Sequence, residues 1–253
     1  MARQRFGQHF LASKPILERI AAAACGAHAG TVVEIGPGHG ALTRVLLPRV
    51  DRVIAVEIDA ELAAELREEF ANEPKLTVVE GDALEQDFAA FHPDVICGNL
   101  PYYVATPLLL RAVRVGVRVV ALIQKEVAER LAAQPGTRDY GYLTCEMALY
   151  AKARILFQVK PGAFRPQPKV DSAVVLLEPC ARATELGVEP DVFLKFLGAC
   201  FQHKRKTLRN NLRGFYPKEE LEAMEETLLR GEQCPLERLA ALYKKLGLAL
   251  GQK

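Results

Sequence analysis

The chain lacks the long apolar runs that mark membrane proteins and the leader that marks many exported ones. Charged residues such as Arg118 and Lys125 interrupt its most hydrophobic segments, so none of them is long enough to cross a bilayer. The first ten residues, MARQRFGQHF, are charged and lack the apolar centre of a secretory signal. These absences predict a cytoplasmic protein without a membrane partner.

Paired cysteines are also absent. The six cysteines are scattered along the chain without a CxxC pair, at Cys25, Cys97, Cys145, Cys180, Cys200 and Cys234. Zinc sites and disulfide frameworks depend on cysteines at short, recurring spacings, so neither is indicated. We expect reduced and mostly buried thiols, and no metal.

Excess charge is small as well. The formal net charge is +2 over 253 residues, so the total charge does not identify a nucleic-acid partner. Half of the residues are apolar and a quarter are charged, as in ordinary globular proteins. The length allows one large domain, or one domain with a small appendage. No oligomeric interface is evident, so a monomer is the default expectation.

What the chain does contain is a regular alternation of strand and helix patterns. Short runs rich in Val and Ile, typical of strands buried on both faces of a parallel sheet, occur at Thr31–Ile35, Val53–Glu57, Leu76–Glu80, Asp94–Cys97 and Arg118–Ile123. Helical patterns follow at Ala41–Leu47, Ala60–Phe70, Pro107–Val113 and Glu126–Ala133. Ser13 can cap an earlier helix through Ile20. The fold class predicted is therefore α/β, with a mostly parallel, Rossmann-like sheet.

The last third of the chain changes character. Ala153–Val159 and Ser172–Leu177 are close enough to form an antiparallel pair of strands at one edge of the sheet. Only helical patterns follow, at Val192–Phe201, Arg205–Leu212, Glu219–Leu229 and Leu236–Leu246. We expect a Rossmann-like domain over residues 1–182 and a small α-helical domain over residues 183–253.

The ends of the predicted strands carry groups suited to a cofactor, because parallel α/β sheets bind ligands at the carboxyl ends of their strands. The first strand runs into a loop that contains Gly36 and Gly38, and glycines allow a sharp turn and a close approach to a ligand. Glu57 ends the second strand, where a carboxylate can accept hydrogen bonds from ribose hydroxyls. Gly36-x-Gly38-x-x-Ala41 also satisfies a dinucleotide fingerprint, so these residues alone leave a nicotinamide cofactor open.

The next strand ends favour S-adenosylmethionine. Asp82 follows the third strand and offers an acceptor for an adenine amino group, and the segment Asn99–Tyr102 after the fourth strand has no role in hydride transfer. Glu34 suits a positive sulfonium with a nearby amino group, whereas a pyrophosphate site is best kept free of anions. We therefore predict S-adenosylmethionine as the cofactor and S-adenosylhomocysteine as the product.

Asn99-Leu100-Pro101-Tyr102 is the most informative tetrapeptide. Methyl transfer to an exocyclic aromatic amine requires the nitrogen to be held against the methyl group. The Asn99 side chain and the Leu100 backbone supply two carbonyl acceptors for the two amino protons, and Pro101 restricts Leu100 to an extended conformation. Tyr102 offers a face on which the target base can stack. Positioning and electrostatics, rather than a strong base, would carry the rate.

Six segments now resemble a known family in order and spacing. They are Arg5–Leu11, the Glu34–Gly40 loop, Val56–Asp59, Gly81-Asp82, Asn99–Tyr102 and Phe164–Ser172. Together they cover nearly the whole chain and resemble the ribosomal RNA adenine N6-dimethyltransferases.

The resemblance implies a role for each matching residue. The residues that it implies to contact the cofactor are His9, Leu11, Gly36, Glu57, Asp82 and Asn99. Tyr102 and Phe164 would hold the target adenine between them. Position 9 is commonly Asn in this family, and His9 has comparable hydrogen-bonding capacity.

The C-terminal region favours the small-subunit enzymes of this family over the resistance enzymes that act on large-subunit RNA. Gln124–Leu131, Tyr140–Leu143 and Phe201–Leu212 resemble the small-subunit group more closely. The residues predicted to contact RNA are all basic, namely Arg3, Arg5, Lys204, Arg205, Lys206, Arg209 and Arg213. A helix would align Arg205, Arg209 and Arg213 on one face. The implied substrate is two adjacent adenosines in a hairpin loop near the 3′ end of small-subunit ribosomal RNA, within an immature subunit.

Three other functions stay open from the sequence alone. The chain could modify large-subunit RNA as a resistance enzyme. It could act mainly as an RNA-binding factor in ribosome assembly, since a fold does not fix a function. It could also methylate an amino group of DNA or of a protein glutamine, because the Asn-x-Pro-Tyr chemistry is shared.

Overall fold

The computed structural model describes residues 9–247, which divide into two compact units. The first unit comprises the described part of Met1–Ala128 together with Ala153–Pro179, and the second comprises Glu129–Lys152 with the described part of Cys180–Lys253. Arg3 and Arg5, two of the predicted RNA contacts, lie outside the described residues.

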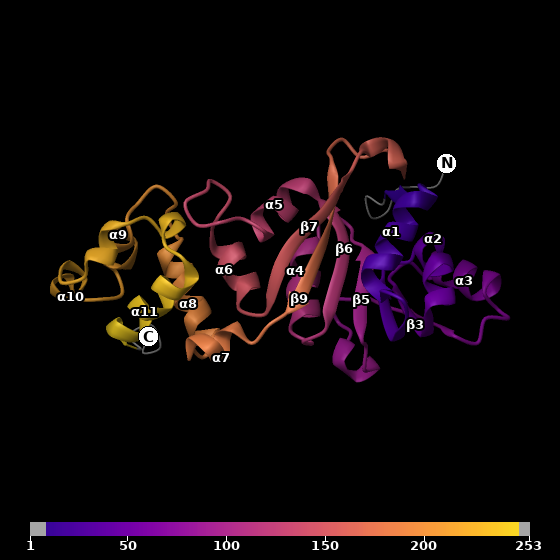
Figure 1. Cartoon of the computed structure of the whole chain (residues 1–253), viewed down its shortest axis with the longest axis horizontal. Coiled ribbons are helices and arrows are strands. Elements are labelled where there is room, and N and C mark those ends of the chain that lie inside the picture. The colour runs from indigo at the N-terminus through magenta and orange to yellow at the C-terminus, as the bar shows by residue number, and fades with distance from the viewer. Residues whose placement is uncertain (1–8, 248–253) are drawn as a thin grey trace. The chain divides into compact units, whose positions relative to one another are not determined.

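A seven-stranded sheet forms the centre of the first unit (Figure 1). Its parallel strands are β2 (Ala29–Ile35), β3 (Val50–Glu57), β4 (Leu76–Glu80), β5 (Val95–Asn99) and β6 (Arg118–Gln124). The strand order is β4-β3-β2-β5-β6-β9-β7, in which β9 (Ser172–Pro179) runs antiparallel to β6 and β7 (Ala151–Val159) lies beside β9. The predicted α/β class and antiparallel edge are confirmed. The strand order reverses between β2 and β5, and such a switch point is where open α/β sheets bind ligands.

Helix α1 (Lys14–Cys25) precedes β2, and helices follow four of the parallel strands as predicted: α2 (Ala41–Leu46), α3 (Ala60–Glu69), α4 (Ala105–Val113) and α5 (Lys125–Leu131). Short 3₁₀ turns occur at Leu47–Arg49, Phe88–Phe91 and Pro161–Ala163. The start of α3 shows how the sequence sets a boundary, because the Asp59 carboxylate accepts hydrogen bonds from the backbone N–H groups of Glu61 and Leu62.

The apolar faces of α1 and α2 pack on the sheet in one continuous core. Ile20 and Leu46 are almost fully buried there against Val32, Val53 and Val120. A small second sheet completes the unit, in which β1 (Phe10–Leu11) pairs antiparallel with β8 (Phe164–Arg165). This pairing ties the start of the described chain to a segment more than 150 residues away. No helix of residues 9–247 is long and apolar enough to cross a membrane.

The second unit is helical and has its own core. Its helices are α6 (Tyr142–Ala148), α7 (Arg182–Leu186), α8 (Pro190–Cys200), α9 (Leu208–Leu212), α10 (Lys218–Glu222) and α11 (Leu236–Leu246), with 3₁₀ turns at Glu225–Leu228 and Gly231–Gln233. Phe193 and Phe196 of α8 are fully buried against Leu239 and Tyr243 of α11. Five of the six cysteines are buried in one unit or the other.

Two expectations differ from the structure. The predicted helix Arg205–Leu212 is wrong at its start, because Thr207 is extended and caps α9 with its hydroxyl, which accepts from the N–H of Asn210. The predicted helix Glu219–Leu229 is instead the short helix α10 followed by the 3₁₀ turn Glu225–Leu228. The second unit also includes Glu129–Lys152, which the sequence-based division placed before residue 182, so the domain bounds 1–182 and 183–253 stay a prediction.

Candidate active site

A cavity of about 890 Å³, open to solvent, lies at the carboxyl ends of β2, β3, β4 and β5. Its lining includes most of the residues predicted for the site, namely His9, Gly36, Gly38, Glu57, Asp82, Asn99, Leu100, Pro101 and Tyr102. The structure therefore brings together groups from four successive strand ends, as the topology requires.

The glycine loop after β2 depends on its glycines. Gly36 and Gly38 have φ values of +67° and +57°, in the left-handed region that other residues rarely adopt. A Cβ atom at Gly38 would lie 2.7 Å from Cε1 of Phe10, so the β1 ring lies directly against the loop. The loop is thus held between β1 and the sheet, and a side chain at position 38 would displace one of them.

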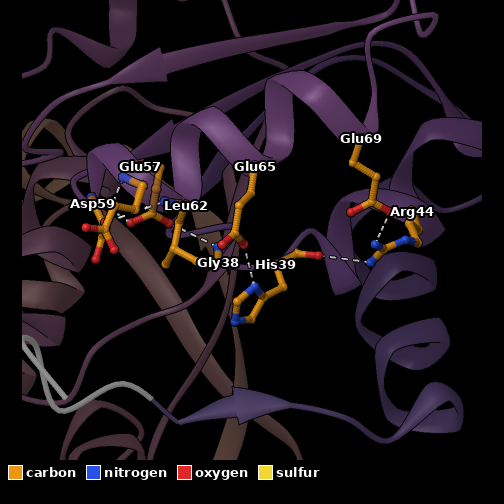
Figure 2. A network of polar contacts seen from close by, with 9 residues as sticks. Gly38, His39, Arg44, Glu57, Asp59, Leu62, Glu65 and Glu69 are labelled. Atoms are coloured by element: carbon orange, nitrogen blue, oxygen red, sulfur yellow. Dashed lines mark hydrogen bonds and ion pairs between the residues drawn. The ribbon is translucent and has the colours of Figure 1, made fainter. Parts of the chain in front are cut away.

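Glu57 fastens this loop to the next strand (Figure 2). Its carboxylate accepts hydrogen bonds from the N–H of Gly38 at 3.0 Å and from the N–H of Asp59 at 3.1 Å. Glu57 is almost fully buried, and burial raises the pKa of its carboxyl group. The predicted ribose acceptor therefore has a second role, because it fixes the glycine loop on which a ligand would rest.

An outer set of contacts connects the same loop to α3 (Figure 2). The His39 ring contacts the Glu65 carboxylate at 3.0 Å, and Arg44 pairs with Glu69 while donating to the carbonyl of His39. These groups are about half exposed, so each contact contributes little to stability. Their effect is to restrain the loop's position rather than to add much free energy.

Glu34 lies beneath the loop and not in the main cavity. It lines a smaller neighbouring cavity with Gly36, Leu11 and Asn99, and its carboxylate accepts a 2.7 Å hydrogen bond from the hydroxyl of Thr43. The side chain is 1% exposed, and burial raises its pKa to about 7. The predicted contact of Glu34 with a ligand therefore stays a prediction, whereas its hydrogen bond with Thr43 joins the end of β2 to α2.

Asn99 is held in a single orientation. Its side-chain N–H donates to the backbone carbonyl of His9 at 2.8 Å, which leaves the side-chain oxygen as the acceptor. The next residue, Leu100, donates its N–H to the carbonyl of Leu122 in β6 at 3.0 Å. The Asn99 side chain is therefore held by His9, and the backbone that carries the second predicted acceptor, the Leu100 carbonyl, is held by β6.

Tyr102 is fixed by a contact that the sequence did not reveal. Its hydroxyl lies 2.7 Å from the hydroxyl of Ser172, a fully buried residue at the start of β9. Burial raises the pKa of Tyr102, so the phenol stays protonated at neutral pH. The His9 ring lies 5.7 Å from the Tyr102 ring, and His9 Nδ1 donates to the carbonyl of Pro166 at 2.9 Å.

Phe164 does not face the cavity. Its side chain is 0% exposed in the core of the first unit, and its backbone pairs with Leu11. Because Phe164 is buried, no open slot for an adenine is seen between Phe164 and Tyr102. The placement of the adenine between these two rings therefore stays a prediction. Tyr103, which the sequence reasoning passed over, is 62% exposed and lines the cavity beside Tyr102. Its position directly after the tetrapeptide was the only available signal.

The remaining predicted residues divide between the units. Asp82 lines the cavity, and its carboxylate also accepts from the N–H of Leu84 at 2.8 Å. Lys204, Arg205 and Lys206 are exposed in the loop before α9 of the second unit. Because α9 begins at Leu208, the predicted alignment of Arg205, Arg209 and Arg213 on one helix is wrong. Across residues 9–247, no group of His, Cys, Asp and Glu is arranged to hold a metal ion.

The strand order, the glycine loop and the Asn-Leu-Pro-Tyr turn at the switch point define a Rossmann-like methyltransferase. Comparison with known proteins narrows this class, because the family model described as ribosomal RNA adenine dimethylase matches residues 1–244. The chain belongs to that family.

Two relatives match almost end to end. The chain is 43% identical to ribosomal RNA small subunit methyltransferase A of Acidobacterium capsulatum, with 96% of this chain and 91% of the relative covered. It is 38% identical to the protein of the same name from Pseudomonas aeruginosa, with 100% and 97% covered.

Two solved structures are similar over most of their length. The crystal structure of a dimethyladenosine transferase from Plasmodium falciparum has a TM-score of 0.80 at 28% identity, covering 92% of this chain and 96% of the other. The 23S rRNA methyltransferase ErmE has a TM-score of 0.68 at 27% identity, covering 94% and 99%.

Proposed function

We propose that the chain transfers methyl groups from S-adenosylmethionine to the N6 amino groups of two adjacent adenosines in a hairpin loop of small-subunit ribosomal RNA. The observation that carries this proposal is the cavity at four strand ends, where Asn99 is oriented by the carbonyl of His9 and followed by a fixed Leu100 and Tyr102. Both bacterial relatives reported above bear names that specify the small ribosomal subunit.

The residues of the cavity fit the proposed cofactor. Gly36 would meet only one atom within 4 Å if it carried a Cβ, the backbone oxygen of Asn99, so the loop leaves open space at that point. Glu57 and Asp82 are acceptors suited to ribose hydroxyls and to an adenine amino group. The cofactor, when bound, supplies an electrophilic methyl group, and no metal is required for that chemistry.

The chain's own residues would then position the target amine. The Asn99 side-chain oxygen and the Leu100 carbonyl accept the two N6 protons, which draws the nitrogen lone pair away from the ring and toward the methyl group. Tyr102, held by Ser172, and the exposed Tyr103 offer aromatic faces for an unstacked base. The proton released from the methylated nitrogen passes to water, since the cavity is open to solvent.

Methyl transfer to undermethylated small subunits tests the proposal. We expect wild-type protein with radiolabelled S-adenosylmethionine to give N6,N6-dimethyladenosine in small-subunit RNA and none in large subunits. Asn99→Ala should slow transfer by about 10²- to 10³-fold, the usual cost of removing one preorganised polar group from an active site. Asn72→Ala, at an exposed loop position in the same unit, is the matched control and should leave the rate unchanged.

The alternatives give different results in the same assay. Label in large subunits alone would assign the chain to the resistance enzymes. The similarity to the 23S rRNA methyltransferase ErmE is the reason for testing this alternative. Absence of label in either subunit, with RNA binding intact, would make the chain an assembly factor. We further propose that the chain acts in the cytoplasm as a monomer on immature subunits, which sedimentation of the purified protein and of its complex with them can test.

A further inference from the structure

The second unit contains a pocket that none of the steps above uses. It has a volume of about 640 Å³ and opens to solvent. Segments from three parts of the chain line it: the end of α5 with the start of α6, the loop after α8, and the 3₁₀ turn Gly231–Gln233. The first two overlap Gln124–Leu131, Tyr140–Leu143 and Phe201–Leu212, the stretches that favoured a small-subunit substrate.

An aromatic surface forms one wall of this pocket. Phe201 is partly exposed, and its ring lies against Gly231, where a Cβ atom would come within 2.9 Å of Cε1. The Tyr140 and Phe201 rings are arranged edge to face with a centroid separation of 6.3 Å, and the Tyr140 hydroxyl accepts a 3.3 Å contact from the thiol of Cys145. The wall is therefore built on buried neighbours, and its position does not depend on a mobile side chain.

Basic groups surround the opening. Arg130, His203 and Lys204 are exposed and line the pocket. Lys204 donates to the carbonyl of Arg138 at 2.5 Å, which holds its ammonium group at the rim. The buried side chain of Asn211 fixes the loop by donating to the carbonyls of Cys200 and His203 and accepting from the N–H of His203.

Two carboxylates, those of Asp139 and Glu232, share the pocket with these basic side chains. A pocket for phosphate alone would be expected to lack them. An exocyclic amino group of a nucleobase donates to such carboxylates, whereas the phosphate and sugar that follow it are attracted to the cationic rim. The aromatic wall suits a base, the carboxylates suit its amino group, and the basic side chains suit its phosphate. Together they match the parts of one nucleotide.

We infer that this pocket binds an unpaired nucleotide of the RNA substrate, with its base stacked on Phe201, its amino group toward Asp139 or Glu232, and its phosphate at Arg130 and Lys204. The inference rests on the proposed function, because it takes the partner to be ribosomal RNA. The nucleotide is not the methylated adenosine, since Asn99 belongs to the other unit. The pocket selects the RNA, and bases with an amino group, adenine, guanine or cytosine, fit it better than uracil.

Binding of undermethylated small ribosomal subunits by the full-length chain, measured at several salt concentrations, tests the inference. Phe201→Leu should weaken binding about 5- to 100-fold, the usual effect of losing one stacked base, without changing the salt dependence. Lys204→Ala should weaken binding and reduce the slope of log K against log salt by about 0.7, the value for one lost phosphate contact. Melting curves test whether each variant is folded. If Phe201→Leu is not folded, Lys204→Ala still tests the pocket.

Matched controls come from the same unit. Lys195→Ala and Phe215→Leu replace an exposed lysine and an exposed phenylalanine that do not line the pocket, and both should bind like wild type. A base that wild type protects from dimethyl sulfate should become reactive with Phe201→Leu. Wild-type affinity for Phe201→Leu, or an equal loss for Lys195→Ala and Lys204→Ala, would overturn the inference. The proposed function would fail by a different result, namely that the wild-type protein makes no dimethyladenosine.

Discussion

Glu34 shows how one buried carboxyl group can make the stability of the folded chain depend on pH. Its side chain is 1% exposed, and burial, opposed by the hydrogen bond from Thr43 and reinforced by the charge of Glu57, raises its pKa from 4.5 to about 7. Between these two values the folded chain holds a proton that the unfolded chain has released. Stability therefore falls as the pH rises through this range.

Glu34→Gln should remove that dependence. The amide oxygen can still accept from Thr43 but does not ionise, so the free energy of unfolding should lose a pH-dependent part on the order of 3 kcal/mol. Urea unfolding at several pH values between about 5 and 8 measures this. Glu65→Gln, at an exposed position, is the control and should keep the wild-type slope. Parallel curves for Glu34→Gln and wild type would show that Glu34 stays ionised in the folded chain.

The glycine loop allows a second prediction. It separates two effects of adding a side chain, a steric clash with a neighbouring residue and strain in the backbone. Gly38→Ala places a Cβ atom 2.7 Å from Phe10 at a φ of +57°. Gly26→Ala meets the same strain, with a φ of +58°, but nothing lies within 4 Å. Strain alone costs about 1–3 kcal/mol, so both variants should be destabilised.

Only Gly38→Ala should also weaken binding of S-adenosylhomocysteine, because Phe10 and the loop must move apart at the cavity. Thermal unfolding gives the first quantity and calorimetric titration the second. Equal affinities for the two variants would mean that β1 does not hold the loop in its binding conformation.

The strands and the site were predictable to different degrees. β2 to β6 were found because each is a short run of Val and Ile bounded by turn residues, and a buried parallel strand requires that composition. Gly36, Glu57, Asp82 and Asn99 followed from the rule that ligands bind at strand ends. The end of a helix is harder to predict, since a single hydroxyl, that of Thr207, decided where α9 begins.

Contacts between distant segments were not predictable. His9 meets Asn99 and Pro166, and Tyr102 meets Ser172, across separations of 70 residues or more. No periodicity in the sequence encodes such pairs, because they result from the pairing of β1 with β8 and the place of β9 in the sheet. The burial of Phe164 has the same origin, since its partner Leu11 lies at the other end of the unit's chain.

The two units of the molecule have separate apolar cores, and every residue that lines the main cavity belongs to the first. A ligand that binds only the folded first unit stabilises it by about 2.7 kcal/mol at a hundred times its dissociation constant. With S-adenosylhomocysteine at that concentration, we expect amide hydrogen exchange to slow in β2, β3 and β5 and to stay unchanged in α8 and α11.

Asp82→Ala serves as the control in the same experiment. Because this variant should bind the ligand more weakly, amide exchange in β2, β3 and β5 should no longer be slowed at the same ligand concentration. Exchange monitored by mass spectrometry on peptides from each unit measures both effects. Equal slowing in α8 and α11 would contradict the prediction, since it would mean that the two cores open together as one cooperative structure. Slowing confined to β2, β3 and β5 would mean that the unit with the cavity can be stabilised while the helical unit keeps its own opening equilibrium.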